Sequence, residues 1–143
     1  MPRVKIQKLH PKARIPAYQS SGASGFDLHA LEALQIAPSA VALVRTGLAV
    51  SLEQGFELQI RSRSGLALRD QIVVLNSPGT IDSDYRGELQ VILMNLSRRV
   101  FSIQPGDRIA QAILCQVFSA QFELVTQLET SARGCKGFGS SGI

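Results

Sequence analysis

A turn-rich acidic segment at residues 76–88 holds the side chains best suited to chemistry. Its bend gathers two carboxylates, a phenol and a guanidinium, from Asp82, Asp84, Tyr85 and Arg86. An ordinary two-residue hairpin turn needs only a pair such as Asn-Gly. The short apolar runs on either side, residues 72–75 and 89–94, are typical of buried strands. Asp and Ser are also common turn residues, so a functional hairpin and a plain turn both remain open here.

A second candidate site is the segment Arg63, Ser64 and Gly65. Ser64 is suited to cap a short helix whose body we expect at residues 66–70. The unpaired N–H groups of a helix start, together with Arg63, could bind phosphate oxygens. The alternative is a plain N-cap without a ligand.

The third candidate is the glycine-rich C-terminal tail, which has too little apolar surface to order itself. Repeated glycines allow several backbone N–H groups to point at one anion, and Arg133 and Lys136 add positive charge. Phe138 fits a simple filler segment poorly, although a disordered tail is the alternative. We therefore expect one β-domain over residues 1–130 and a flexible tail over residues 131–143.

Isolated polar residues elsewhere are less informative. Asp27 is exposed on an expected half-buried strand at residues 23–30, and Gln111 lies in an apolar strand where it either faces outward or contacts a ligand. Neither of the two histidines has a partner that would make it a metal ligand or base. The two cysteines, Cys115 and Cys135, lack zinc spacing and are expected to be free thiols.

The elements that must position these residues are mostly strands. The 143 residues are 45% apolar, and 12 Gly and 6 Pro recur between short apolar runs, which is typical of a single all-β domain. Besides the strands named above, we expect strands at residues 4–9, 41–45, 48–52, 56–61, 100–103 and 109–118. A type II turn is expected at residues 104–107, and the helix after residue 63 is the only one expected.

Charge and hydropathy limit the partners. The net charge is +4, but the basic residues stand singly or in pairs, which is a poor footprint for nucleic acid and suits a small polyanion. No apolar run approaches the length of a membrane span, and the N-terminus lacks the apolar block of a signal peptide. We expect a cytoplasmic protein that contacts neither nucleic acid nor membrane.

Five segments in order resemble the five motifs of the trimeric dUTPases. They are residues 23–28 (ASGFDL), 63–67 (RSGLA), 79–87 (GTIDSDYRG), 106–111 (GDRIAQ) and 133–142 (RGCKGFGSSG). The segments are distributed along the chain in the family's order, so the resemblance extends over the whole chain. Two positions depart from the family pattern: Ser62 stands where Pro is frequent, and Ser141 where Thr is frequent. Neither change removes a group that the chemistry requires.

The resemblance implies a distorted jelly-roll-like β-barrel with one short helix. It also implies a homotrimer whose three active sites each draw on all three chains. The implied reaction is Mg²⁺-assisted hydrolysis of dUTP to dUMP and pyrophosphate by water attack at the α-phosphorus. Such an enzyme keeps uracil out of DNA and supplies dUMP for thymidylate synthesis.

The resemblance also assigns the reacting and phosphate-binding groups by position. Asp82 would orient and deprotonate the attacking water, and Asp27 would hold Mg²⁺ through water. The phosphate chain would be gripped by Arg63, Ser64, Gly65 and Gln111.

The uracil edge would pair with Asn76 and with backbone groups of Thr80, Ile81 and Gln90, in a slot too narrow for a 5-methyl group. Tyr85 would lie on the deoxyribose and leave no room for a 2′-hydroxyl. The tail of another subunit would then close over the nucleotide. It would place Phe138 on the base and Arg133 and Ser140 on the terminal phosphate, with Gly139 among the binding residues.

Two alternatives share the fold. A dCTP deaminase needs a glutamate on the strand that leaves the hairpin, where this chain has Ile92, and its usual Asp-Pro-Gly hairpin pattern is absent. A non-catalytic nucleotide-binding member would be expected to lose Asp82 or the tail motif, and both are present. The sequence therefore favours hydrolysis of dUTP.

Overall fold

The structure is a computed structural model, and it describes residues 2–137. That part of the chain contains strands and one short α-helix, as the sequence predicts. The elements are β1 (Lys5–Lys8), β2 (Phe26–His29), β3 (Leu34–Ile36), β4 (Val41–Ser51), β5 (Phe56–Arg61), α1 (Ser64–Asp70), β6 (Ile72–Val74), β7 (Gly79–Ile81), β8 (Glu88–Asn95), β9 (Phe101–Ile103) and β10 (Arg108–Gln116).

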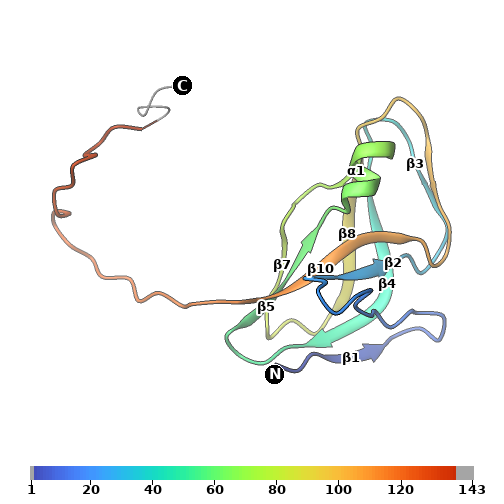
Figure 1. The fold of residues 1–143 in the computed structure, drawn as a ribbon, viewed down its shortest axis with the longest axis horizontal. Coiled ribbons are helices and arrows are strands. Elements are labelled where there is room, and N and C mark those ends of the chain that lie inside the picture. The colour runs from blue at the N-terminus through green and yellow to red at the C-terminus, as the bar shows by residue number, and fades with distance from the viewer. Residues whose placement is uncertain (1, 138–143) are drawn as a thin grey trace.

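The strands form two four-stranded antiparallel sheets and one two-stranded sheet (Figure 1). The first sheet has the order β1-β4-β8-β6, the second β2-β10-β5-β7, and the third pairs β3 with β9. Buried side chains from both large sheets pack into one core, among them Leu28, Leu58, Val91 and Leu93. Within residues 2–137 the hydrogen-bond ladders remain separate sheets and do not close into a barrel.

Strand β8 illustrates why the apolar runs fold as they do. Its residues alternate between half-buried and buried positions, and Leu89, Val91 and Leu93 face the core with at most 2% of their surface exposed. A period of two is the signature of a strand with one face on a core. The opposite face carries Gln90 and Ile92. The predicted strand at residues 89–94 is thereby confirmed.

Strand β4 corrects the expected break between residues 45 and 48. We expected two strands separated by a turn at Thr46 and Gly47, but the structure has one strand with a bulge there. The partner strand pairs with Arg45 and then with Ala49, and Gly47 adopts a φ of +71° that favours glycine. A turn and a bulge use the same residue types, so the sequence could not separate them.

Helix α1 begins earlier than predicted, and the expected Ser64 cap is wrong. The N-cap is Arg63, whose carbonyl accepts the Ala67 N–H at 3.0 Å, and it makes no side-chain capping hydrogen bond. Ser64 is therefore already inside the helix. The neighbouring Ser62 hydroxyl is engaged elsewhere, because it accepts the N–H of Val74 at 2.8 Å.

The expected turn at residues 104–107 is confirmed by the φ of +88° at Gly106 and a hydrogen bond from Asp107 N–H to the Gln104 carbonyl.

After β10 the chain leaves the body as an extended arm over residues 117–137, drawn in orange to red in Figure 1. The N–H of Val117 still binds the Gly55 carbonyl at 2.8 Å. Beyond it Phe118, Phe122 and Leu124 are 85%, 96% and 100% exposed. This exposed arm begins before residue 131, and the predicted boundary at residue 130 stays a prediction.

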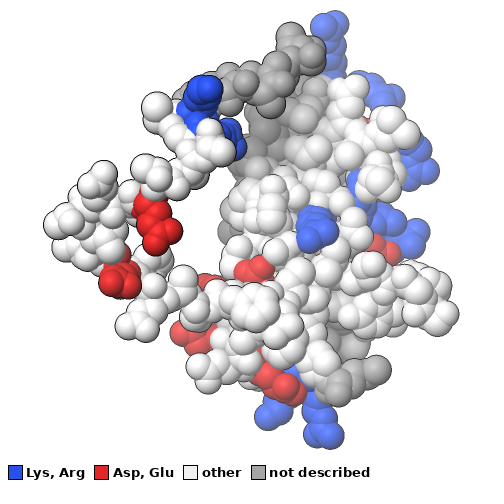
Figure 2. Space-filling view, turned by 60° about the vertical axis from the view of Figure 1, so that its left-hand side comes forward, with Lys and Arg blue, Asp and Glu red and all other residues white. Residues whose placement is uncertain are grey.

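Charges of both signs are mixed over the surface. Figure 2 shows acidic side chains on the projecting arm and on the body, and basic side chains singly or in small groups over the visible face of the body and toward the end of the arm. The described part of the chain has no helix that is long and apolar enough to cross a membrane.

Candidate active site

Strands β2 and β10 and the N-cap of α1 place a compact ion cluster at one end of the second sheet. The Asp27 carboxylate receives the Arg63 Nε at 3.0 Å on one oxygen and the Arg108 Nη1 at 3.4 Å on the other. Arg63 also donates from Nη1 to the Arg108 carbonyl at 3.0 Å. Asp27 is only 14% exposed in this cluster and Arg63 22%, so both side chains are held rather than free in solvent. One carboxylate between two guanidinium groups leaves a net positive site suited to phosphate.

Gln111 lies next to this cluster, in the middle of the sheet. Its backbone is paired with Asp27 on one side and with Arg61 on the other. Its Nε2 donates to the Ser62 carbonyl at 3.0 Å, which holds the amide near the start of α1. Gly25 lets the chain just before β2 lie close against β10, because a Cβ at that position would come within 2.9 Å of the Ala112 carbonyl oxygen and 3.5 Å of the Gln111 Oε1.

Ser64 and Gly65 follow Arg63 in the first turn of α1. Ser64 is exposed and Gly65 is half-buried. The structure therefore brings together five residues predicted to hold magnesium or the phosphate chain: Asp27, Arg63, Ser64, Gly65 and Gln111.

The hairpin residues lie on a different part of the body. Strand β6 pairs with β8, but the segment between them enters the other sheet, where β7 pairs with β5. Thr80 stands opposite Gln59 and Ile81 opposite Leu58. Because β7 is an edge strand, one side of its backbone has no ladder partner.

Asn76 stands beside the start of β7. A Cβ added to buried Gly79 would lie 3.1 Å from the Asn76 Nδ2, so the amide packs closely over that glycine. Gln90 lies on β8, paired with Arg45. Asn76, Thr80 and Ile81 thus share one stretch of chain, with an open backbone edge beside them.

The tip of the hairpin carries Asp82 and Tyr85. Asp82 is exposed, and its carbonyl accepts the Tyr85 N–H at 3.2 Å to close the turn. The Tyr85 hydroxyl donates to the Glu88 carbonyl at 3.1 Å, and 43% of the residue is exposed. Arg86 donates from Nη1 to the carbonyls of Ser83 and Tyr85 at 2.7 and 2.8 Å.

Within one chain the hairpin tip is separated from the ion cluster. Ile81 pairs with Leu58, so Asp82 follows at about the level of Glu57, whereas Gln111 pairs with Arg61. Four residues along a strand span about 13 Å, and Arg63 lies beyond that end. The Asp82 side chain is too short to bridge this gap, so a single chain does not bring Asp82 together with Arg63.

The C-terminal residues are far less defined by contacts. Arg133 is exposed and donates from Nε to the Lys136 carbonyl at 2.9 Å, and the Gly134 N–H donates to the Ser131 carbonyl at 3.0 Å. Phe138, Gly139 and Ser140 lie outside the described residues, so the structure does not place these three predicted binding residues.

His29 is the titratable group most affected by the cluster. Burial lowers the pKa of its imidazole, the positive charges of Arg14, Arg108 and Arg63 lower it further, and Asp27 opposes them. Its Nδ1 is buried without a hydrogen-bond partner in the described part of the chain. The neutral imidazole is therefore the form that fits this environment.

The donor set fits magnesium only in a particular way. Among residues 2–137 there is no group of three His, Cys, Asp or Glu side chains that could enclose a metal ion. Magnesium usually keeps several waters and binds one or two carboxylates together with substrate phosphates. Asp27 beside a phosphate-binding cluster meets that requirement, so the residues fit Mg²⁺ brought in with a nucleotide and do not fit a closed protein cage.

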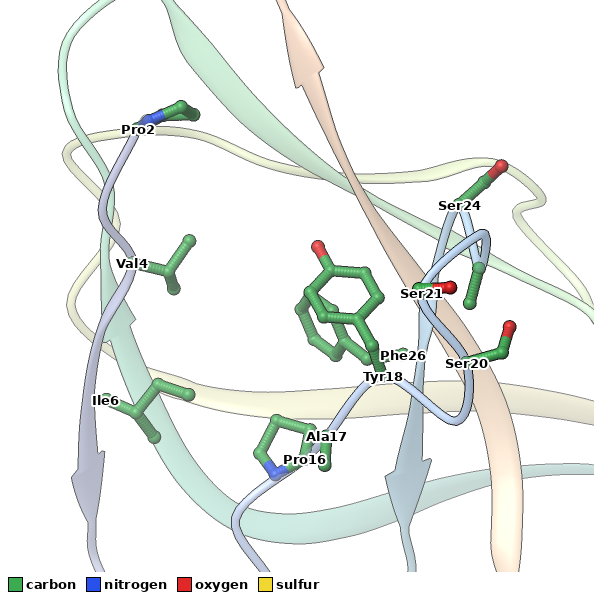
Figure 3. A pocket seen from close by; sticks show the side chains of 11 residues that line it. Pro2, Val4, Ile6, Pro16, Ala17, Tyr18, Ser20, Ser21, Ser24 and Phe26 are labelled. Carbon is green, nitrogen blue, oxygen red and sulfur yellow. The ribbon is translucent and has the colours of Figure 1, made fainter.

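A mainly apolar pocket of about 530 Å³ has no charged side chain in its lining (Figure 3). It is formed by β1 and the segment before β2, with the rings of Tyr18 and Phe26 packed edge to face at a centroid distance of 5.5 Å. None of the predicted site residues lines it. Its apolar lining is suited to packing against hydrophobic side chains.

Arg108 is the member of the cluster that the sequence analysis did not select. It contacts Asp27 with its side chain and Arg63 with its carbonyl. The signal was present, since Arg108 lies three residues before Gln111 within residues 106–111. Its pairing with Asp27 depends on a register shift between β2 and β10 at Arg108 and Ala110, which the sequence does not reveal.

Comparison with known proteins gives consistent matches. A family model described as dUTPase matches residues 11–142. A deoxyuridine 5'-triphosphate nucleotidohydrolase of Helicobacter pylori is 57% identical over 141 residues, which cover 99% of this chain and 97% of that protein. A Staphylococcus bacteriophage 80alpha dUTPase (G164S mutant, with dUpNHpp) has a TM-score of 0.91 at 25% identity, covering 99% of each chain. Another similar structure is a D95N mutant dUTPase from phage phi11 of S. aureus, with a coordinated structural Mg(II) ion. Its TM-score is 0.83 at 22% identity, and the match covers 90% of this chain and 99% of that one. This likeness concerns the fold alone.

Proposed function

Because the chain belongs to the dUTPase family, we propose that it hydrolyses dUTP to dUMP and pyrophosphate by water attack at the α-phosphorus. The observation that carries this proposal is the cluster of Asp27, Arg63 and Arg108, with Gln111 beside it. It offers donors and positive charge where a polyphosphate would lie. The proposed place of action is the cytoplasm.

Arg63, Ser64, Gly65 and Gln111 are the proposed grip on the phosphate chain. Arg63 is already fixed by Asp27 and by the Arg108 carbonyl, so little ordering is required when a phosphate replaces the carboxylate as its partner. The backbone N–H groups of Ser64 and Gly65 lie in the first turn of α1 and have no partner within the helix.

Asp82 is the proposed general base. Its carboxylate is exposed at the hairpin tip and would take the proton of the attacking water. Mg²⁺ is the proposed cofactor, and when bound it supplies charge neutralisation on the phosphates. Asp27 would hold it through water, with the oxygen that Arg63 releases.

Base and sugar selection are proposed to reside in the hairpin. The open edge of β7 supports pairing of the uracil with backbone groups of Thr80 and Ile81, with Asn76 beside them. A slot built from backbone does not widen easily, which would exclude the methyl group of thymine. Tyr85 would close the space that a ribose 2′-hydroxyl needs.

We also propose that the chain works as a homotrimer of jelly-roll-like subunits whose sites are shared. The separation of Asp82 from the ion cluster within one chain supports this proposal, since hairpin and phosphate grip would then come from different chains. The exposed apolar arm and outward residues such as Val41 and Leu43, 51% and 57% exposed, also require a cover. Arg133, Phe138, Gly139 and Ser140 would reach the nucleotide from a neighbouring chain.

The test is a screen of all common nucleoside and deoxynucleoside triphosphates for pyrophosphate release with Mg²⁺ present. We expect release from dUTP and far slower release from dTTP, dCTP and UTP. Light scattering of the active sample should give the mass of a trimer. Pyrophosphate release that did not favour dUTP would overturn the proposed function, and a monomer or dimer mass would overturn the shared site.

A further inference from the structure

Glu88, the first residue of β8, links the hairpin tip to a bulge in the neighbouring strand. We propose that Glu88 is a positioning residue for Tyr85, and that it thereby helps the enzyme to discriminate dUTP from UTP. This inference rests on the proposed function and deepens it, because it concerns how the sugar-selecting side chain is held. Glu88 itself is not expected to touch the nucleotide.

The Glu88 carboxylate is anchored by three hydrogen bonds. Its Oε1 accepts the backbone N–H of Gly47 at 2.8 Å, and the Arg45 Nε donates to Oε1 and Oε2 at 3.2 and 3.0 Å. The Glu88 side chain is only 14% exposed. The hydrogen bond and charge of Glu88 also raise the pKa of Arg45 above its ordinary value. The carboxylate is therefore a fixed group rather than a solvated surface charge.

The bulge that receives this carboxylate is itself fixed. Gly47 has a φ of +71°, and a Cβ there would come within 2.9 Å of the Ala13 Cβ and 3.2 Å of a Leu31 methyl group. The neighbouring Thr46 hydroxyl donates to the Leu89 carbonyl at 2.6 Å. The position of Gly47 N–H is thus set by packing on both sides. The hydrogen bond from Gly47 to Glu88 therefore fixes the start of β8, the strand that follows the hairpin tip.

The link from Glu88 to Tyr85 is a hydrogen bond and a close packing contact. The Glu88 carbonyl accepts the Tyr85 hydroxyl at 3.1 Å. The ring also lies over Gly87, where an added Cβ would overlap the phenol. The Tyr85 ring is otherwise partly exposed, so these contacts decide its orientation. Movement of Glu88 would move the carbonyl and release the ring.

The expected consequence is specific to the sugar. The ring excludes a 2′-hydroxyl only while it lies flat and close, and a ring free to rotate leaves room for that group. The base slot is proposed to use Asn76 and backbone groups of β7 and Gln90, whereas the hydrogen bonds of the Glu88 carboxylate run to Gly47 and Arg45. Loss of the anchor should therefore reduce selection against ribose and leave selection against the 5-methyl group intact.

The experiment compares kcat/KM for dUTP, UTP and dTTP in the wild type and in six variants. Two of these are the double variant Glu88→Ala/Tyr85→Phe and the reference variant Tyr85→Ala, which removes the ring. The other four are single changes at Glu88, Tyr85 and Glu32. Glu88→Ala removes the anchor, and Glu88→Gln keeps an oxygen that can accept the Gly47 N–H. Tyr85→Phe keeps the ring and removes the hydroxyl donor. The matched control is Glu32→Ala, because Glu32 is the other carboxylate on Arg45, at 3.4 Å, and is 55% exposed without a link to Gly47 or Tyr85.

We expect the dUTP to UTP ratio to fall about three- to tenfold in both Glu88→Ala and Tyr85→Phe, as suits the loss of one hydrogen bond. The double variant should lose little more than either single one, because both changes break the same link. Glu88→Gln should recover most of the ratio, Glu32→Ala should keep it, and the dUTP to dTTP ratio should stay constant throughout.

The outcomes separate this inference from the proposed function. If the wild-type chain shows no preference for dUTP, the proposed function fails and the inference falls with it. If the wild type prefers dUTP and Tyr85→Ala abolishes sugar selection, but Tyr85→Phe keeps the full ratio, the positioning role of Glu88 is refuted. An equal fall in the dUTP to UTP and dUTP to dTTP ratios of Glu88→Ala would also refute it, since that result indicates general damage. Tyr85→Phe provides the test even if Glu88→Ala does not fold.

Discussion

Asp82 is an exposed carboxylate at the hairpin tip, and its proposed role makes a sharp prediction. Asp82→Asn should reduce hydrolysis of dUTP by at least about a hundredfold, because the amide keeps the size of the side chain and loses the basic oxygen. Binding of a non-hydrolysable imido analogue of dUTP, measured by calorimetry, should stay within about threefold of the wild type. Near-normal turnover in the variant would remove Asp82 from the mechanism.

The matched control for Asp82 is Asp84, which is also an exposed carboxylate of the same hairpin tip. Asp84→Asn changes the same charge without removing the proposed base. Its turnover should stay within about threefold of the wild type. An equal loss in both variants would point to the charge of the tip rather than to proton transfer.

His29 makes the stability of the chain sensitive to pH. The unfolded chain takes up a proton at the ordinary pKa of 6.5, whereas burial and the neighbouring arginines lower the pKa in the folded chain. The unfolded state therefore binds more protons as the pH falls through 6.5, and the free energy of unfolding decreases there. Between about pH 8 and pH 5.5, the Tm of the His29→Gln variant should therefore fall less than the Tm of the wild type. Parallel Tm curves for the two proteins would contradict this account.

At the scale of elements, the sequence predicts strands well where one face is buried. Residues 56–61 form β5 within the expected bounds, and β8 follows the expected alternation. Strands β3 and β7 were not predicted, although the equally short β6 and β9 lie within runs that were. Strand β7 begins at Gly79, directly after Pro78 in a segment rich in turn residues, and this composition indicates a turn rather than a strand. At Gly47 the sequence predicts a turn as readily as a bulge, because both need a residue with a left-handed backbone conformation.

The residues of the candidate site, like the strands, could be predicted from the sequence only in part. Residue types and order indicated Arg63, and the resemblance to the trimeric dUTPases added Asp27 and Gln111; the structure brings these three residues together. Arg108 and Glu88 were not selected, because their contacts join residues 81 and 41 positions apart and depend on strand register. Single-chain sequence patterns contain periodicity and turn chemistry, but they do not contain the register of non-consecutive strands.

The arm and tail form the element whose contribution can be tested by deletion. Residues 131–137 are fully on the surface and make only local hydrogen bonds. Removal of residues 131–143 should therefore leave the Tm within about 2 °C of the wild type, because the described part of this segment, residues 131–137, makes no core contact. Turnover of dUTP should fall by at least about a hundredfold, since the proposed closure over the triphosphate is absent. Full activity of the truncated chain would exclude the tail from the site.

At the scale of the whole molecule, the separation of the hairpin tip from the ion cluster has a further consequence. Asp82 lies level with Glu57 on one side of the sheet, and Gln111 pairs with Arg61 on the other, about 13 Å along the strand. A site that needs both must take them from two copies of the chain. A closed cyclic assembly provides such a site at every interface and leaves no open end.

The decisive measurement mixes two inactive parents. Chains lacking residues 131–143 keep Asp82, and Asp82→Asn chains keep the tail, so neither parent should hydrolyse dUTP. In mixed trimers some sites should combine an intact hairpin with a tail from another chain, and turnover should return to a substantial fraction of the wild-type value. The mixed trimers should be verified with two different affinity tags, one on each parent chain. The control is each parent trimer assembled by itself from chains that carry the two tags. Verified mixed trimers that remain inactive would mean that each tail serves the hairpin of its own chain, and the shared site would have to be abandoned.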